Sequence, residues 1–187
     1  MKVGLVLESG EPREVPRRRG WRTPAGWNGP GFTPGAGWLT GRTGIGYGDG
    51  DDATVLGDMD GGYLSIFCRR EFSVTGVSAI GRLVLSIDYD DGFVAYLNGV
   101  EVARSATLGL PGTQVDWNDT AGSREAGSFE EYPLPAELLQ SGSNVLAIQV
   151  HNSAVDSSDF SFSPELTAGL LNIDGGATWK FLRGSEA

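Results

Sequence analysis

Cysteine, histidine and long apolar segments are nearly absent from this chain of 187 residues. The single cysteine, Cys68, permits no internal disulfide and no cysteine-based zinc site. Its place in an apolar run predicts a small buried side chain. No apolar run approaches the ~18 residues of a membrane helix, so membrane insertion is not expected. The segment Met1–Leu7 is too short for a secretory signal, because Glu8 ends its apolar run.

Positive charge is also scarce. The chain has 14 Lys and Arg residues against 24 Asp and Glu residues, which gives a formal net charge of −10. General nucleic-acid binding depends on basic side chains that neutralise phosphates, so no nucleic-acid partner is expected. The acidic composition is compatible with cations or neutral sugars as ligands.

The known catalytic motifs are missing as well. The chain contains no Gly-x-Ser-x-Gly elbow, no phosphate-binding glycine-rich signature and no EF-hand spacing. The only histidine, His151, precedes Ser157-Ser158-Asp159, so it either fixes a loop or belongs to a Ser–His–Asp arrangement. Whether two carboxylates could act as a glycosidase pair depends on the distance between them in the fold. We therefore expect a protein that is not an enzyme.

Glycine is abundant, with 29 residues beside 9 prolines, which predicts many turns and few long helices. Asn98-Gly99 between two apolar runs predicts a tight β-hairpin, because both residues readily adopt positive φ angles. Short alternating apolar segments separated by turn residues predict an all-β fold, an antiparallel β-sandwich. The expected strands are Tyr63–Val74, Leu83–Ile87, Phe93–Leu97, Val100–Arg104, Asn144–Val150 and Phe160–Leu166.

Three segments are expected along the chain. Residues 1–19 read as an N-terminal strand, Lys2–Leu7, and a charged arm. Residues 20–168 read as the β-sandwich module. Residues 169–187 read as a C-terminal extension, because Thr178–Gly184 is similar in type to the segment around Trp21. This extension would be either the start of a next repeat or a strand used in assembly.

Two acidic loops are the candidate metal site. Asp residues suit Ca²⁺, a hard cation that takes ~6–8 oxygen ligands, and carboxylates gathered without a cation would repel one another. The alternative is that they are solvated turn residues, since Asp also favours turns. The candidate ligands are Asp49, Asp51 and Asp52 in the first loop and Asp88, Asp90 and Asp91 in the second.

Aromatic side chains in loops are the candidate sugar-binding residues. Trp and Tyr rings stack on the apolar faces of sugar rings while their polar edges stay in water. The alternative for each ring is that it packs its loop onto the core. The expected ligand-binding residues are Trp27, Trp38, Tyr47 and Trp117, with Asn152 as a hydrogen-bonding partner for sugar hydroxyls.

Several segments in order carry a family resemblance: "GIGYGDGDDAT", "RREFSV", "DYDDGFVAYLNGVEVAR", "LPAELLQSGSNVLAIQVHN" and "SSDFSFSPEL". Over roughly Trp21 to Leu166 they resemble the galactose-binding-like jelly-roll modules of large secreted bacterial proteins. The hairpin region is also similar to the sugar-binding domain of family 2 glycoside hydrolases. "DDG" before a hairpin is similar to PA14-type lectins, in which paired Asp residues hold Ca²⁺. The resemblance implies ligand or metal sites in the end loops, with Asp90 and Asp91 in the positions of the lectin pair.

Together these observations predict a non-catalytic carbohydrate-binding module, stabilised by Ca²⁺, with a polysaccharide or glycan as partner. The protein would be extracellular or lie at the cell surface. The alternative function is a structural subunit of a surface layer, adhesin or filament. That subunit would self-associate by strand pairing through its N- and C-terminal extensions.

Overall fold

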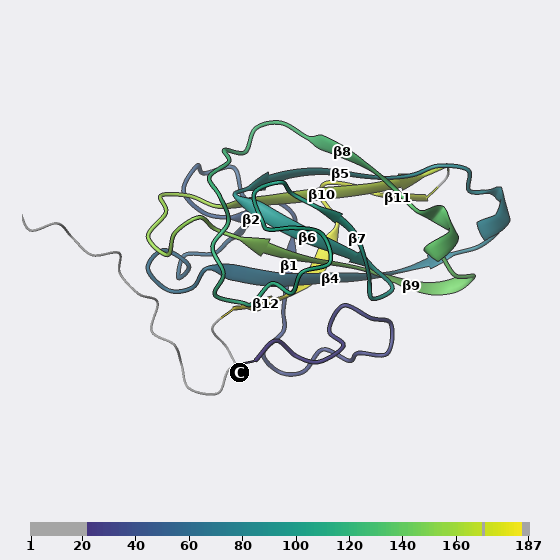
Figure 1. Cartoon of the computed structure of the whole chain (residues 1–187), viewed down its shortest axis with the longest axis horizontal. Coiled ribbons are helices and arrows are strands. Elements are labelled where there is room, and N and C mark those ends of the chain that lie inside the picture. The colour runs from purple at the N-terminus through teal and green to yellow at the C-terminus, as the bar shows by residue number, and fades with distance from the viewer. Residues whose placement is uncertain (1–21, 170, 185–187) are drawn as a thin grey trace, which may run out of the picture.

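The computed structural model describes residues 22–169 and 171–184. The predicted strand Lys2–Leu7 and the charged arm therefore lie outside the described residues. Within the described ranges the helical elements are two short 3-10 turns, η1 (Val77–Ala79) and η2 (Ala136–Leu138). Strands form two facing layers (Figure 1), so the predicted antiparallel β-sandwich is confirmed. None of the helices in this part of the chain is long and apolar enough to cross a bilayer.

The larger layer is a six-stranded sheet in which all neighbours are antiparallel. Its strands, in spatial order, are β1 (Leu39–Arg42), β12 (Thr178–Arg183), β4 (Ser65–Val74), β9 (Gly142–His151), β6 (Gly92–Leu97) and β7 (Val100–Arg104).

The smaller layer is a four-stranded antiparallel sheet, and a short parallel pair lies at one end of the sandwich. The sheet contains β11 (Leu171–Ile173), β10 (Ser161–Ala168), β5 (Leu83–Asp90) and β8 (Glu130–Leu134), and the pair contains β2 (Ile45–Gly46) and β3 (Thr54–Val55).

The core lies between the two sheets and follows the two-residue period of a strand. Ile66 and Cys68 of β4, Leu85 and Ile87 of β5, and Ile148 of β9 are all fully buried in one apolar cluster. The buried position of Cys68 confirms its predicted role as a small core side chain. Because the space between the sheets is apolar, polar groups gather in the loops at the ends of the strands.

The C-terminal region belongs to the sandwich, which corrects the boundary predicted at residue 168. Strand β12 pairs with β1 on one side and with β4 on the other, with Leu39 opposite Phe181 and Phe181 opposite Cys68. Trp179 and Phe181 are buried in the main core. Because both edges of β12 are already paired, this strand is not available to extend the sheet of a neighbouring subunit.

Asn98 does more than form the predicted hairpin turn. It adopts a φ of 53°, as the turn requires. Its side-chain amide also donates to the carbonyl of Leu138 at 2.9 Å and to Oδ1 of Asn144 at 2.8 Å, while its Oδ1 accepts from the Val145 amide at 2.9 Å. The hairpin is thereby tied to η2 and to β9.

Replacing Asn98 with glycine should lower the free energy of unfolding by about 2 kcal/mol, because glycine keeps the positive φ but removes three partly buried side-chain hydrogen bonds. Equilibrium unfolding in urea measures this. Asn98→Asp, which places a carboxylate oxygen against the Leu138 carbonyl and Oδ1 of Asn144, should lose at least as much. An Asn98→Gly protein as stable as the wild type would show that the residue serves only the turn.

Candidate functional site

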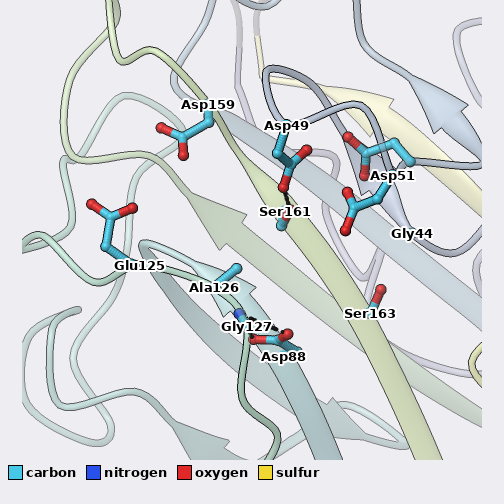
Figure 2. A pocket seen from close by; sticks show the side chains of 11 residues that line it. Gly44, Asp49, Asp51, Asp88, Glu125, Ala126, Gly127, Asp159, Ser161 and Ser163 are labelled. Carbon is cyan, nitrogen blue, oxygen red and sulfur yellow. Dashed lines mark hydrogen bonds between the residues drawn. The ribbon is translucent and has the colours of Figure 1, made fainter.

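A cleft lies at the end of the sandwich where β5 finishes and β10 begins, and its volume is about 330 Å³. Three connecting segments bring acidic side chains to it: the loop between β2 and β3, the loop before β8 and the loop before β10. Figure 2 shows Glu125 and Asp159 on one side of this acidic cleft and Asp49 and Asp51 on the other. Its lining comprises Gly44, Asp49, Asp51, Asp52, Asp88, Glu125, Ala126, Gly127, Asp159, Ser161 and Ser163.

The first acidic cluster consists of Asp49, Asp51 and Asp52, which each offer a carboxylate oxygen within 4.8 Å of the others. Burial, followed by the charges of Asp49 and Asp51, raises the pKa of Asp52 to about 7. Its Oδ2 is buried and has no hydrogen-bond partner. A hydrogen bond with Asp49, together with that residue's charge, raises the pKa of Asp51. The three carboxylates therefore repel one another, and a bound cation would relieve that repulsion.

Glycine at position 46 allows this cluster to sit so close to the sheet. A Cβ on Gly46 would lie 2.7 Å from Oδ1 of Asp52 and would collide with the carbonyl oxygen of Phe160. Strand β2 can therefore pass between the β10 entry and the Asp52 carboxylate only without a side chain.

The second cluster consists of Asp90, Glu125 and Asp159, whose ligand atoms also lie within 4.8 Å of one another. Asp90 ends β5 and is only 3% exposed. Burial is the main cause that raises the pKa of Asp90 to about 7, and the neighbouring Asp91 charge adds to it. Glu125 and Asp159 were not predicted from the sequence as metal ligands. Both stand in long loops without local periodicity, so only the fold brings them to Asp90.

The other two predicted metal ligands, Asp88 and Asp91, hold the loop that carries Glu125. Asp91 accepts hydrogen bonds from the amides of Arg124 (2.8 Å) and Ser153. Asp88 accepts from the amides of Gly127 and Ser128 at 2.9 to 3.2 Å. The six predicted aspartates thus separate into two groups: Asp49, Asp51, Asp52 and Asp90 offer oxygens within the clusters, while Asp88 and Asp91 fasten backbone.

The donor chemistry of both clusters fits a hard cation. Every candidate ligand is a carboxylate oxygen, and the buried Oδ2 of Asp52 lacks a donor that would otherwise satisfy it. Carboxylate oxygens are what Ca²⁺ takes, whereas zinc sites draw on Cys and His. Asp49, Asp51 and Asp52 would hold one ion, and Asp90, Glu125 and Asp159 would hold another.

Three of the predicted sugar-stacking rings are buried, which corrects that prediction. Trp27 packs edge-on against Phe67 and Tyr96, with ring centroids 5.0 and 5.9 Å apart. Trp38 packs in the same cluster, on the outer face of the six-stranded sheet. This cluster pins residues 22–38 against that face (Figure 1, purple). Tyr47 is also buried, and its hydroxyl donates to the carbonyl of Ser157 at 2.7 Å.

The remaining two predicted ligand-binding residues also have structural contacts. Trp117 is half-buried and packs against the Trp27 cluster, while its carbonyl accepts a hydrogen bond from Ser65 Oγ at 2.6 Å. Asn152 is buried, and its amide donates to Tyr47 Oη and to the carbonyl of Asp159, both at 3.2 Å. Asn152 therefore positions the Asp159 loop and has no exposed edge for a sugar.

His151 is enclosed in the protein and does not face the acidic cleft. Its Nδ1 lies 2.7 Å from the carbonyl oxygen of Asp119, and its Nε2 lies 2.7 Å from Nε2 of Gln149. A carbonyl can only accept, so Nδ1 carries the proton and Nε2 accepts from the glutamine amide. Burial lowers the pKa of His151 to about 4. This geometry agrees with a histidine that fixes a loop.

Comparison with known proteins finds no matching family model and no curated protein with a similar sequence. Several solved structures are similar in fold. An α-L-rhamnosidase from Aspergillus terreus is 16% identical with a TM-score of 0.41, covering 81% of this chain and 16% of that one. The PA14 domain of the antifreeze protein MpAFP is 18% identical with a TM-score of 0.34, covering 65% and 53%.

A β-D-mannosidase from Dictyoglomus thermophilum is 18% identical with a TM-score of 0.30 and covers 46% of this chain. The chain spans only 8% of that mannosidase and at most about half of the others named here. Likenesses at these identities concern the β-sandwich fold alone. The finer assignment to the galactose-binding-like group stays a prediction.

Proposed function

We propose that this domain is a non-catalytic carbohydrate-binding module that binds its glycan through calcium held in the acidic cleft. The observation that carries the proposal is that carboxylates of both clusters line one open cleft of about 330 Å³, with Asp90 buried behind Glu125 and Asp159 as their third partner. Small-molecule pockets have volumes of ~300–1,000 Å³, so the cleft is large enough for about one sugar ring.

The proposed chemistry follows from incomplete coordination. Three carboxylates in each cluster leave some of the ~6–8 oxygen positions of Ca²⁺ open toward the cleft. Neighbouring sugar hydroxyls can fill such positions, and the hydroxyls of Ser161 and Ser163 lie in the lining as further hydrogen-bonding groups. The carboxylates then hold the ion, and the ion and the serine hydroxyls bind and orient the glycan without breaking a bond.

The short spacing within each cluster suits the binding of a single cation. One carboxylate oxygen from each residue of a cluster lies within 4.8 Å of the others. An extracellular or cell-surface location is part of the proposal.

Affinity electrophoresis on a panel of neutral and acidic polysaccharides tests the proposal. We expect at least one polysaccharide to retard the protein in millimolar Ca²⁺, and we expect that retardation to disappear in EDTA. Asp52→Asn should behave in Ca²⁺ as the wild type does in EDTA. Equal mobility on every polysaccharide, with and without the ion, would contradict the proposal.

A matched control removes one carboxylate elsewhere. Glu137 is exposed on η2, which lies away from the cleft at the other end of the sandwich (Figure 1). Glu137→Gln makes the same carboxylate-to-amide change without touching either cluster. It should keep the full calcium-dependent retardation.

A further inference from the structure

Phe129 is the one exposed aromatic side chain among the residues that the structure describes. It is 50% exposed, whereas every other Trp, Tyr or Phe ring in residues 22–169 and 171–184 is buried or half-buried. Within those ranges its ring packs against no other ring. Single apolar side chains are common on protein surfaces, so the position of Phe129 decides whether its ring has a use.

Phe129 lies beside the acidic cleft. The pairing of β5 with β8 extends to Ile87 opposite Glu130, so Phe129 comes next to Asp88, which lines the cleft. On the other side of Asp88, β10 places Ser163, another lining residue (Figure 2). Side chains directly opposite in an antiparallel pair have Cβ atoms about 4.5–5.5 Å apart. A row of three side chains therefore leads from the cleft to the Phe129 ring.

The Phe129 ring also lies on the same face of the sheet as this part of the cleft. In β8, Tyr132 and Leu134 pack into the core, whereas Glu131 between Glu130 and Tyr132 is exposed on the outer face. Phe129 is two residues before Glu131, so the two-residue period of a strand places its side chain on that outer face.

The chain on both sides of Phe129 is held in place by Arg124. One terminal nitrogen of Arg124 donates to the carbonyl of Ser128 at 2.9 Å, and its Nε donates to the carboxylate of Glu130 at 3.0 Å. Its guanidinium carbon lies 3.9 Å from the centre of the Tyr89 ring. The exposed ring is therefore mounted on a fixed segment, and a ligand that stacks on it would not need to order this loop.

We propose that Phe129 is the stacking platform for a second sugar unit, next to the unit that binds calcium in the cleft. This inference rests on the proposed function and adds that the glycan is a neutral oligosaccharide of at least two units. A phenyl ring offers an apolar face without a polar edge, which suits the C–H face of a pyranose. The neighbouring carboxylates of Asp88 and Glu131 would repel an anionic sugar at this position.

Arrayed mono-, di- and trisaccharides of glucose, galactose, mannose and xylose, probed in millimolar Ca²⁺, test the inference. We expect the wild type to bind the di- and trisaccharides of at least one sugar more tightly than the monosaccharide. Phe129→Ala should weaken that di- and trisaccharide binding about 5- to 10-fold and leave monosaccharide binding unchanged. Phe129→Trp, which keeps a flat ring, should bind at least as tightly as the wild type.

Val100→Ala is the matched control. Val100 is 49% exposed and begins β7 beside the Asn98 turn, which is tied to η2 at the end of the sandwich away from the cleft. This variant should bind every arrayed sugar as the wild type does. Phe129→Ala should keep the full calcium-dependent rise in Tm, which separates loss of the platform from loss of the ion or of the fold.

The failure of this inference and the failure of the proposed function give different results. Calcium-dependent binding by the wild type, with equal disaccharide affinity in Phe129→Ala, would refute the platform and leave the proposed function standing. An equal loss of mono- and disaccharide affinity would refute the assignment of a second unit to Phe129. A wild type that binds none of the arrayed sugars in Ca²⁺ would overturn both.

Discussion

Asp90→Asn should abolish the stability that calcium bound by Asp90, Glu125 and Asp159 gives to this domain. A ligand at 100 times its dissociation constant adds about 2.7 kcal/mol to the free energy of unfolding. For a domain of this length, that corresponds to about 5–10 °C in Tm. The wild type should show a rise of this size for each occupied cluster between EDTA and millimolar Ca²⁺, measured by differential scanning calorimetry. The variant should keep only the rise that Asp49, Asp51 and Asp52 contribute.

In EDTA above pH 7 the same variant should be at least as stable as the wild type. The carboxyl of Asp90 is buried, and its pKa of about 7 lies far above the ordinary value of 3.8. A carboxyl with a raised pKa in the folded state stabilises the metal-free protein at low pH, and this contribution is lost as pH rises through about 7. Asparagine removes the buried charge, so the penalty disappears with it.

Glu137→Gln, away from the cleft, should keep the full calcium effect and the wild-type pH dependence. Two results would contradict the assignment of Asp90. One is an equal calcium-dependent rise in Tm for Asp90→Asn and the wild type. The other is a loss of stability in EDTA at pH 8, which would show that the carboxylate has a structural role without an ion.

Lowering the pH from about 6.5 to 4 should cost about 3 kcal/mol of unfolding free energy through His151 alone. Burial lowers the pKa of this histidine from 6.5 to about 4. The unfolded chain therefore takes up a proton in a pH range where the folded protein does not. The stability is fully present above pH 6.5 and is lost as pH falls toward 4, at about 1.4 kcal/mol per pH unit.

Asp52 and Asp90 have raised pKa values and act in the opposite direction, so the His151 contribution must be read from the difference between the wild type and His151→Gln. In urea unfolding between pH 7 and 4.5, the wild type should lose about 2.5 kcal/mol of stability relative to His151→Gln. The chain has one histidine, so a single imidazole resonance reports its protonation by NMR. Titration of that resonance near pH 6.5 in the folded protein would refute the prediction.

The strands of the sandwich could be predicted from the sequence because their signals are local. Val100–Arg104 was predicted with the bounds of β7, and the run Asn144–Val150 lies within β9, since alternation and the Asn-Gly turn need no distant information. Strand β12 was misread as an extension. Its apolar residues Trp179 and Phe181 alternate correctly, but its partners β1 and β4 lie more than 100 residues earlier.

The acidic cleft could be predicted only in part. Dense runs of Asp identify Asp49, Asp51, Asp52 and Asp90 as candidate ligands. The sequence does not show that Asp91 instead accepts hydrogen bonds from backbone amides, because those amides lie in distant loops. The predicted sugar-stacking role of the loop aromatics was wrong for a physical reason. An indole in a glycine-rich loop can either stack on a sugar or cover an apolar sheet face, and Phe67 on the outer face of β4 decides the second for Trp27.

The position of β12 between β1 and β4 also imposes an order of events on the newly made protein. Strands β1 and β4 emerge from the ribosome early, yet each has an edge that only residues 178–183 cover. Until those residues are synthesised, two adjacent strand edges remain open to pairing with other chains. A truncation after residue 168 should therefore leave a product prone to aggregate, and completion of the large sheet should be among the last steps of folding.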